Sequence, residues 1–69
     1  MEIKLPQNIK ALRHDNNLTQ GQLAEKLGTT QRKVSYWENG TVEPDIRSLW
    51  QLANTFEVSI DELIGRTEL

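Results

Sequence analysis

The chain has 69 residues, which suits one domain near the lower size limit at which a single hydrophobic core outweighs chain entropy. It contains no cysteine and one histidine, which excludes disulfides and thiolate metal sites, so no metal and no cofactor are predicted. Its formal net charge of −2 is unusual for a nucleic-acid-binding domain. Because the sequence has no apolar stretch of signal-peptide or membrane-spanning length, we expect a cytoplasmic protein with no membrane contact.

The charges are distributed unevenly along the chain. Residues 1–40 carry six basic and four acidic side chains, a local charge of +2, whereas residues 41–69 carry two basic and six acidic ones, a local charge of −4. Such a molecule can turn its basic end toward phosphate and its acidic end away from it. The charge pattern therefore predicts modest nucleic-acid affinity that depends strongly on salt.

The first predicted helix has Pro6 at its first position and is broken by residues 15–17, with Ile9 and Leu12 facing inward. Two short helices joined by a tight turn follow within residues 18–40. Gly28 ends the first of these two helices in the left-handed conformation. The first of the two is predicted to start at a capping box of Thr19 with Gln22, and the second is predicted to be capped by either Thr29 or Thr30. Their predicted core residues are Leu23, Ala24, Leu27, Val34 and Trp37.

Two more helices complete the predicted chain, after a loop at residues 41–44. Asp45 is the expected cap of the longer one, and Ser59 with Glu62 forms a capping box for a short last helix that stops at Gly65. The apolar residues that recur at helical spacing in the longer helix, and are predicted to close the core, are Ile46, Leu49, Trp50, Leu52, Ala53 and Phe56. No linker or internal repeat is present, so we expect one all-α domain over residues 1–69.

The helix after the tight turn has an outward polar face. A rotation of about 100° per residue puts Arg32 and Tyr36 opposite the inward side and Gln31 near the N-terminal end, the end that enters the DNA groove in helix-turn-helix docking. Arg32 can donate twice to guanine, Gln31 can pair with adenine, and Tyr36 can contact a thymine methyl or a phosphate. These three are the predicted base-contacting residues. The alternative is that they are only solvated polar side chains.

Contacts to the DNA backbone are predicted beside this face. Gln20 lies at the N-terminus of the preceding helix, where free backbone N–H groups favour a phosphate. The further candidates for DNA backbone contact are Lys10, Lys33, Ser35, Asn39 and Thr41.

Together these segments resemble the Cro/C1-type helix-turn-helix regulators, which include phage repressors and Xre-like bacterial repressors. The resemblance covers about residues 8–65 through the segments NIKALR, LTQGQLAEKLG, VSYWENG, EPDIRSLWQLANTF and VSIDELIG. It is most specific toward the lambdoid repressors, which are compact five-helix bundles with the third helix in the major groove. The resemblance therefore implies a repressor-like transcription regulator that binds double-stranded DNA at a two-fold symmetric operator.

The resemblance also implies roles for single residues. The positions of Gln31, Arg32 and Tyr36 contact bases in the resembling repressors, in agreement with the helical rotation. The positions of Arg13 and Glu38 form a partly buried ion pair there, and Glu38 lies beside the inward side of its helix. The chain departs from the lambdoid pattern after Gly40, where residues 42–43 replace a basic stretch and weaken the expected anchoring to DNA.

Two-fold contacts in the resembling repressors use the region of the last helix. The apolar residues that this chain offers there are Val58, Ile60 and Leu69, with a place in the core as the alternative for Ile60. Trp50, where the family commonly has an aliphatic residue, either fills the core or lies half-exposed at an interface. We therefore expect a homodimer at least on DNA.

A second function from another class is a protein-interaction module of the same fold, such as an antitoxin whose main partner is a protein. The acidic second half and the weak overall basicity favour it. An enzyme is not expected, because the sequence has no set of nucleophile, base and orienting group and no phosphate-binding glycine loop.

Overall fold

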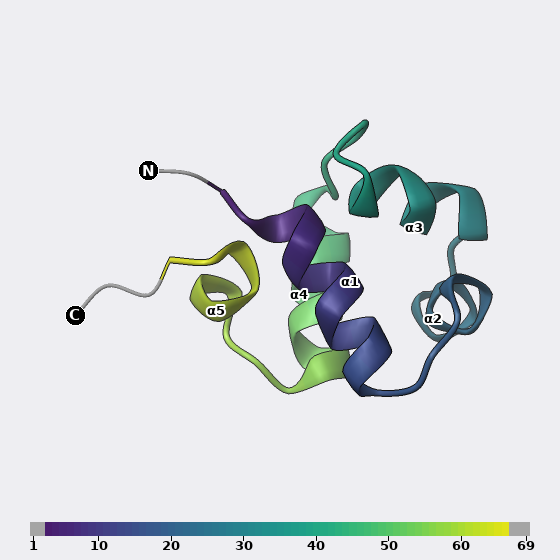
Figure 1. Ribbon diagram of the computed structural model, residues 1–69, viewed down its shortest axis with the longest axis horizontal. Helices are drawn as coiled ribbons and strands as arrows, with labels where there is room; N and C mark the ends of the chain where they lie inside the picture. The colour runs from purple at the N-terminus through teal and green to yellow at the C-terminus, as the bar shows by residue number, and fades with distance from the viewer. Residues whose placement is uncertain (1–2, 67–69) are drawn as a thin grey trace.

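The computed structural model describes residues 3–66, so Leu69 lies outside the described residues. Regular structure in the described part is entirely helical, which confirms the predicted all-α five-helix fold (Figure 1). The helices are α1 (Leu5–Asp15), α2 (Gln20–Leu27), α3 (Gln31–Glu38), α4 (Ile46–Phe56) and α5 (Ile60–Ile64). They surround one core in a body that measures 34 × 23 × 20 Å.

Helix α1 lies between α3 and α5 and contacts both. It begins at Leu5, one residue before Pro6, and its buried residues Leu5, Ile9 and Arg13 recur every four positions on one face. Asn8 joins α1 to α5, because its side-chain Nδ2 donates to the carbonyl of Leu63 at 3.0 Å.

Helices α2 and α3 begin and end on local signals. Thr19 Oγ1 accepts from the N–H of Gln22 at 3.0 Å and Gln22 Oε1 accepts from the N–H of Thr19 at 2.8 Å, which confirms the capping box. Gly28 ends α2 with a φ of 68°, a conformation that glycine adopts without strain. Thr30, rather than Thr29, caps α3 by accepting from the N–H of Lys33.

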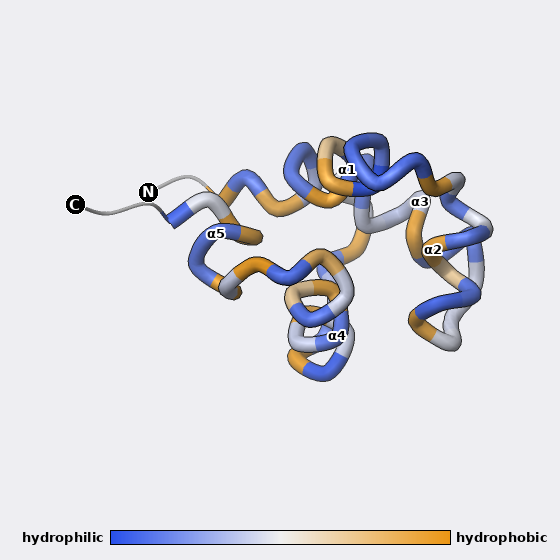
Figure 2. Tube along the Cα trace, turned by 90° about the horizontal axis from the view of Figure 1, so that it is seen from below, coloured by the Kyte–Doolittle hydropathy of each residue, from blue (hydrophilic) through white to orange (hydrophobic). Residues whose placement is uncertain are grey.

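The core contains residues from all five helices, and Figure 2 shows apolar and polar stretches alternating along them. The fully buried large side chains are Ile9, Leu23, Val34, Leu52 and Leu63. Predicted core residues of α4 divide into two groups. Leu52, Ala53 and Phe56 are buried and Leu49 packs against them, as predicted.

Ile46 does not close the core as predicted, because it is 85% exposed. Of the two places predicted for Trp50, the core and a half-exposed position, the structure has the exposed one, because this side chain is 58% exposed. The two residues are four positions apart and share one edge of the apolar stripe of α4. Other helices cover the centre of that stripe and leave this edge open. Helices α2 and α3 lie at one end of the molecule and α5 at the other (Figures 1 and 2).

Candidate nucleic-acid interface

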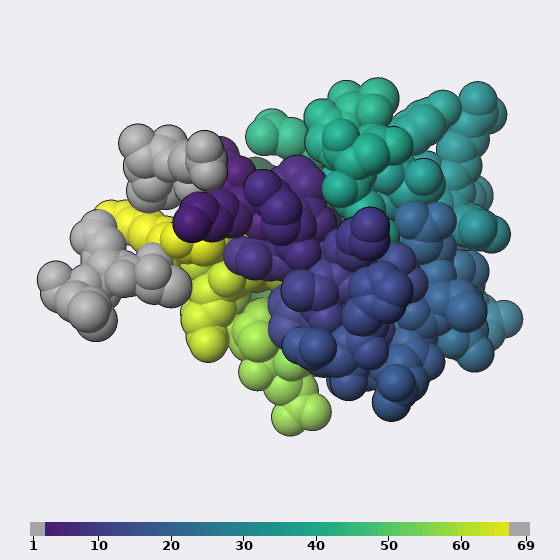
Figure 3. Space-filling model, viewed as in Figure 1, coloured from purple at the N-terminus to yellow at the C-terminus, as the bar shows by residue number. Residues whose placement is uncertain are grey.

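Helix α3 has two inward residues in the core and an exposed first turn. Val34 is fully buried and Trp37 is 3% exposed, which confirms the predicted inward side. Gln31, Arg32 and Lys33 in the first turn are exposed. Figure 3 shows the first turns of α3 and the neighbouring α2 at the outer edge of the molecule. The N-terminal half of α3 is therefore accessible to a macromolecule.

Arg32 and Tyr36 contact one another on this outward surface. Arg32 Nε donates to the Tyr36 hydroxyl at 2.9 Å, and the guanidinium carbon lies 5.6 Å from the centre of the tyrosine ring. Arg32 is exposed and Tyr36 is half-buried. The pair links two of the three predicted base-contacting residues.

A buried ion pair supports α3 from the side of α1. Arg13 donates from Nε to Glu38 Oε2 at 2.6 Å and from Nη2 to Glu38 Oε1 at 3.0 Å. The two side chains are 9% and 4% exposed. A third donor of Arg13, Nη1, binds the carbonyl of Leu18 at 2.9 Å, between α1 and α2. Arg13 of α1 is thus bonded both to Glu38 at the end of α3 and to Leu18 in the loop before α2.

The charges of this pair stabilise one another. Burial alone would raise the pKa of Glu38, but hydrogen bonds from Arg13 and Gln20 and attraction to Arg13 and Lys10 outweigh it and hold that pKa below its ordinary value. The hydrogen bond to Glu38 raises the pKa of Arg13 despite burial. Both groups therefore stay charged at neutral pH.

Gln20 connects this ion pair to the surface. Its Nε2 donates to Glu38 Oε1 at 3.2 Å, which leaves the second N–H of the amide for another acceptor. Gln20 and Gln31 line one shallow hollow together with Thr19 and part of the loop between α1 and α2. The structure therefore brings a predicted DNA backbone contact and a predicted base contact to the same place.

The predicted lysine contacts lie close to acidic groups. Lys10 is exposed on α1, near enough to Glu38 to attract its charge. Lys33 is exposed on α3 and attracts Asp45, whose pKa is lowered mainly by hydrogen bonds from Ser48 at the start of α4. Nearby carboxylates reduce the attraction that either lysine exerts on a phosphate.

The end of α3 is organised by Asn39. Its Oδ1 accepts from the backbone N–H of Thr41 at 3.1 Å and from the Thr41 hydroxyl at 2.6 Å. The same N–H also donates to the carbonyl of Tyr36 at 3.0 Å. Ser35 is half-buried, and its carbonyl accepts from the N–H of Asn39. Asn39 keeps its side-chain N–H groups, whereas the N–H of Thr41 already has two acceptors.

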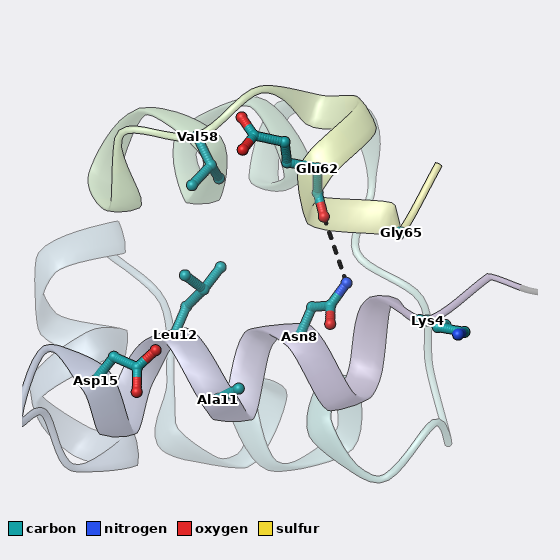
Figure 4. A pocket seen from close by; sticks show the side chains of 8 residues that line it. All are labelled: Lys4, Asn8, Ala11, Leu12, Asp15, Val58, Glu62 and Gly65. Carbon is teal, nitrogen blue, oxygen red and sulfur yellow. Dashed lines mark hydrogen bonds between the residues drawn. The ribbon is translucent and has the colours of Figure 1, made fainter. Parts of the chain in front are cut away.

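The predicted dimer residues line different hollows. Val58 is half-buried against the core and lines a groove between α1 and α5, where the Asn8 side chain points at the backbone of α5 (Figure 4). Ile60 is 39% exposed and lines a hollow with Ile46 and Trp50 on α4. We call Ile46, Trp50 and Ile60 the α4–α5 patch.

Sequence reasoning did not identify the hydrogen bond from Gln20 to Glu38, nor the pairing of Arg32 with Tyr36. The spacing of four residues was the available signal for the second. In residues 3–66, no group of three or more acidic or histidine side chains is arranged to hold a metal ion. Nor is any helix in that part of the chain long and apolar enough to cross a membrane.

Comparison with solved structures supports this description of the fold. A transcriptional regulator from Listeria innocua superimposes with a TM-score of 0.92 at 35% identity, over all of this chain and 64% of that one. The P22 c2 repressor, solved in complex with a synthetic operator, gives a TM-score of 0.84 at 26% identity, over 90% of this chain and 94% of that one. The fold is therefore that of the lambda repressor-like helix-turn-helix domains.

Sequence comparison assigns the family. The HTH-type transcriptional activator BcrR of Enterococcus faecalis is 41% identical over 63 residues, 91% of this chain and 31% of that protein. This chain spans between 31% and 57% of the lengths of three curated relatives that it matches. The helix-turn-helix family model matches residues 9–63. The chain therefore belongs to the Cro/C1-type helix-turn-helix family, to which Xre-like transcription regulators belong.

Proposed function

We propose that this chain binds double-stranded DNA sequence-specifically and acts as a repressor-like transcription regulator. The observation that carries the proposal is the first turn of α3, where Gln31, Arg32 and Lys33 are exposed above the buried Val34 and Trp37. The N-terminal residues of a recognition helix are the ones that reach base edges in the major groove. The family assignment and the structural likeness to an operator-bound repressor support this use of α3.

Within this proposal, Gln31, Arg32 and Tyr36 contact bases, and the surrounding polar residues contact the DNA backbone. Gln20 is a strong backbone candidate because Glu38 fixes one of its amide N–H groups and leaves the other. The remaining candidates for DNA backbone contact are Lys10, Lys33, Ser35, Asn39 and Thr41.

We also propose that two copies bind one operator, with the α4–α5 patch between them. Large exposed apolar side chains at neighbouring positions are typical of an interaction surface. Ile60 belongs to this patch, whereas Val58 offers less surface because it packs against the core. Two copies would then contact half-sites separated by about one helical turn, roughly 34–36 Å.

Selection of bound sequences from a random DNA pool tests the proposal, followed by a comparison of Arg32→Ala with Lys33→Ala on the selected site. Both substitutions remove one positive charge from the first turn of α3. If Arg32 reads a base, its loss costs about 1–3 kcal/mol on the cognate site and relaxes preference at one base pair per half-site. Lys33→Ala should instead lower the affinity for cognate and random DNA alike, because it removes a phosphate contact.

Two results would contradict these assignments. A uniform loss of affinity for every sequence in Arg32→Ala would make Arg32 a phosphate contact. If the wild type selects no sequence and neither substitution changes DNA binding, the protein-interaction module is the better description of this chain.

A further inference from the structure

The contact between Arg32 and Tyr36 constrains how the arginine meets its target. Tyr36 is four residues after Arg32, so the two side chains are neighbours on the same face of α3. The hydroxyl accepts from Nε at 2.9 Å, and the ring lies beside the guanidinium group. Tyr36 is itself anchored, because its carbonyl accepts from the N–H of Thr41 at 3.0 Å and of Val42 at 3.3 Å.

The nitrogen used in this contact decides which donors remain. A guanidinium group has five N–H donors, of which Nε carries one and Nη1 and Nη2 carry two each. Guanine offers two acceptors in the major groove, O6 and N7. An arginine can bridge them from its side, with Nε and one terminal nitrogen, or from its end, with both terminal nitrogens. The Tyr36 hydroxyl already takes the Nε proton, so the end-on arrangement is the one left.

We infer that the Tyr36 hydroxyl holds Arg32 for end-on reading of guanine through Nη1 and Nη2, a positioning role beside the proposed base contact of the tyrosine ring. The inference rests on the proposed function and deepens it by naming the base and the donor atoms. Arginine loses considerable rotamer freedom on binding, and a side chain already held in one direction loses less. No acidic side chain forms an ion pair with Arg32 among residues 3–66, so the terminal nitrogens have no competing carboxylate there.

Tyr36→Phe tests this role because it removes the hydroxyl and keeps the ring. The measurement is the ratio of affinities for the selected duplex and for a duplex with A·T at the read pair. Loss of one hydrogen bond should lower this ratio by about threefold to tenfold, with little change in affinity for random DNA. Lys33→Ala is the matched control, which lowers both affinities and leaves the ratio unchanged.

A double-mutant cycle separates positioning from direct contact. In the Arg32→Ala background, Tyr36→Phe should change neither the ratio nor the affinity. A duplex with 7-deazaguanine at the read position lacks the N7 acceptor. The wild type should therefore bind this duplex more weakly than the unmodified one, whereas the affinity of Arg32→Ala should be the same for both. Circular dichroism and thermal unfolding check that each variant is folded.

Two outcomes would overturn the inference. If Tyr36→Phe lowers affinity equally with and without Arg32, the hydroxyl contacts DNA itself and does not act through Arg32. If Tyr36→Phe leaves base discrimination at its wild-type value, the hydroxyl does not position Arg32. Failure of the proposed function is a different result, since the wild type would then select no sequence from a random pool.

Discussion

Removal of the Glu38 carboxylate should destabilise the fold more than removal of any exposed carboxylate. Glu38→Ala deletes the acceptor of two Arg13 hydrogen bonds and of one from Gln20. Arg13, which is 8% exposed, then keeps its bond to the carbonyl of Leu18 but loses its counter-charge. Breaking a buried ion pair by removing one partner costs about 3–5 kcal/mol. We expect a loss of about 3 kcal/mol in the free energy of unfolding, because Arg13 still donates one hydrogen bond to the Leu18 carbonyl.

This loss is large for a chain of 69 residues, whose whole free energy of unfolding should be about 3–10 kcal/mol. Urea unfolding followed by circular dichroism measures it as a shift of the midpoint at constant slope. Glu25→Ala is the matched control, because Glu25 is exposed on α2 and its removal should change stability by less than about 0.5 kcal/mol. Equal midpoints for the two variants would refute the reasoning.

The pH dependence gives an independent check on the same pair. The pKa of Glu38 is lower in the folded protein than its ordinary value, so its stabilising effect is fully present above the unfolded pKa. The effect is lost as the pH falls through the folded pKa. The difference in stability between the wild type and Glu38→Ala should therefore shrink below about pH 4. A difference that stays constant down to pH 2 would show that the carboxylate is not held by Arg13.

Two further substitutions address the turn and the α4–α5 patch. Gly28→Ala should lower the free energy of unfolding by about 1–2 kcal/mol in a thermal melt, because φ is 68° there, whereas Gly28→Asn should lose less. An equal loss in both variants would point to crowding, although no atom beyond the two adjacent residues lies within 4 Å of an added Cβ. Trp50→Gln should keep the unfolding midpoint, because this side chain is 58% exposed, and should reduce cooperative binding of two copies to one operator. Unchanged cooperativity in gel shifts would remove Trp50 from the interface.

The features that the sequence predicted are those set by nearby residues. Thr19 with Gln22 and Ser59 with Glu62 form capping boxes within three residues, so their outcome depends little on the rest of the chain. The inward side of α3 follows from helical rotation alone. The pairing of Arg13 with Glu38, 25 positions apart, came from the family resemblance, because local spacing carries no such information.

The features that the sequence did not predict depend on which part of each helix its neighbours cover. Periodicity predicts that Ile46 and Trp50 share a face with buried residues of α4, but it does not tell where neighbouring helices stop. The bond from Gln20 to Glu38 spans 18 positions and forms only when α2 and α3 cross. Contacts of this kind follow from tertiary packing.

A net charge of −2 is compatible with sequence-specific DNA binding if base reading contributes more than general attraction to phosphate. Lys10 lies near the carboxylate of Glu38, and Lys33 lies near that of Asp45. These negative charges reduce the attraction of both lysines to the phosphates of any DNA. Arg32 instead donates to the Tyr36 hydroxyl at the outward surface of α3, and no carboxylate within residues 3–66 forms an ion pair with it. If these lysines contact phosphate as proposed, their weaker pull lowers the affinity for random and cognate DNA alike, and discrimination between the two rests on the proposed base contacts. On this proposal, a modest absolute affinity is compatible with a high ratio of specific to non-specific affinity.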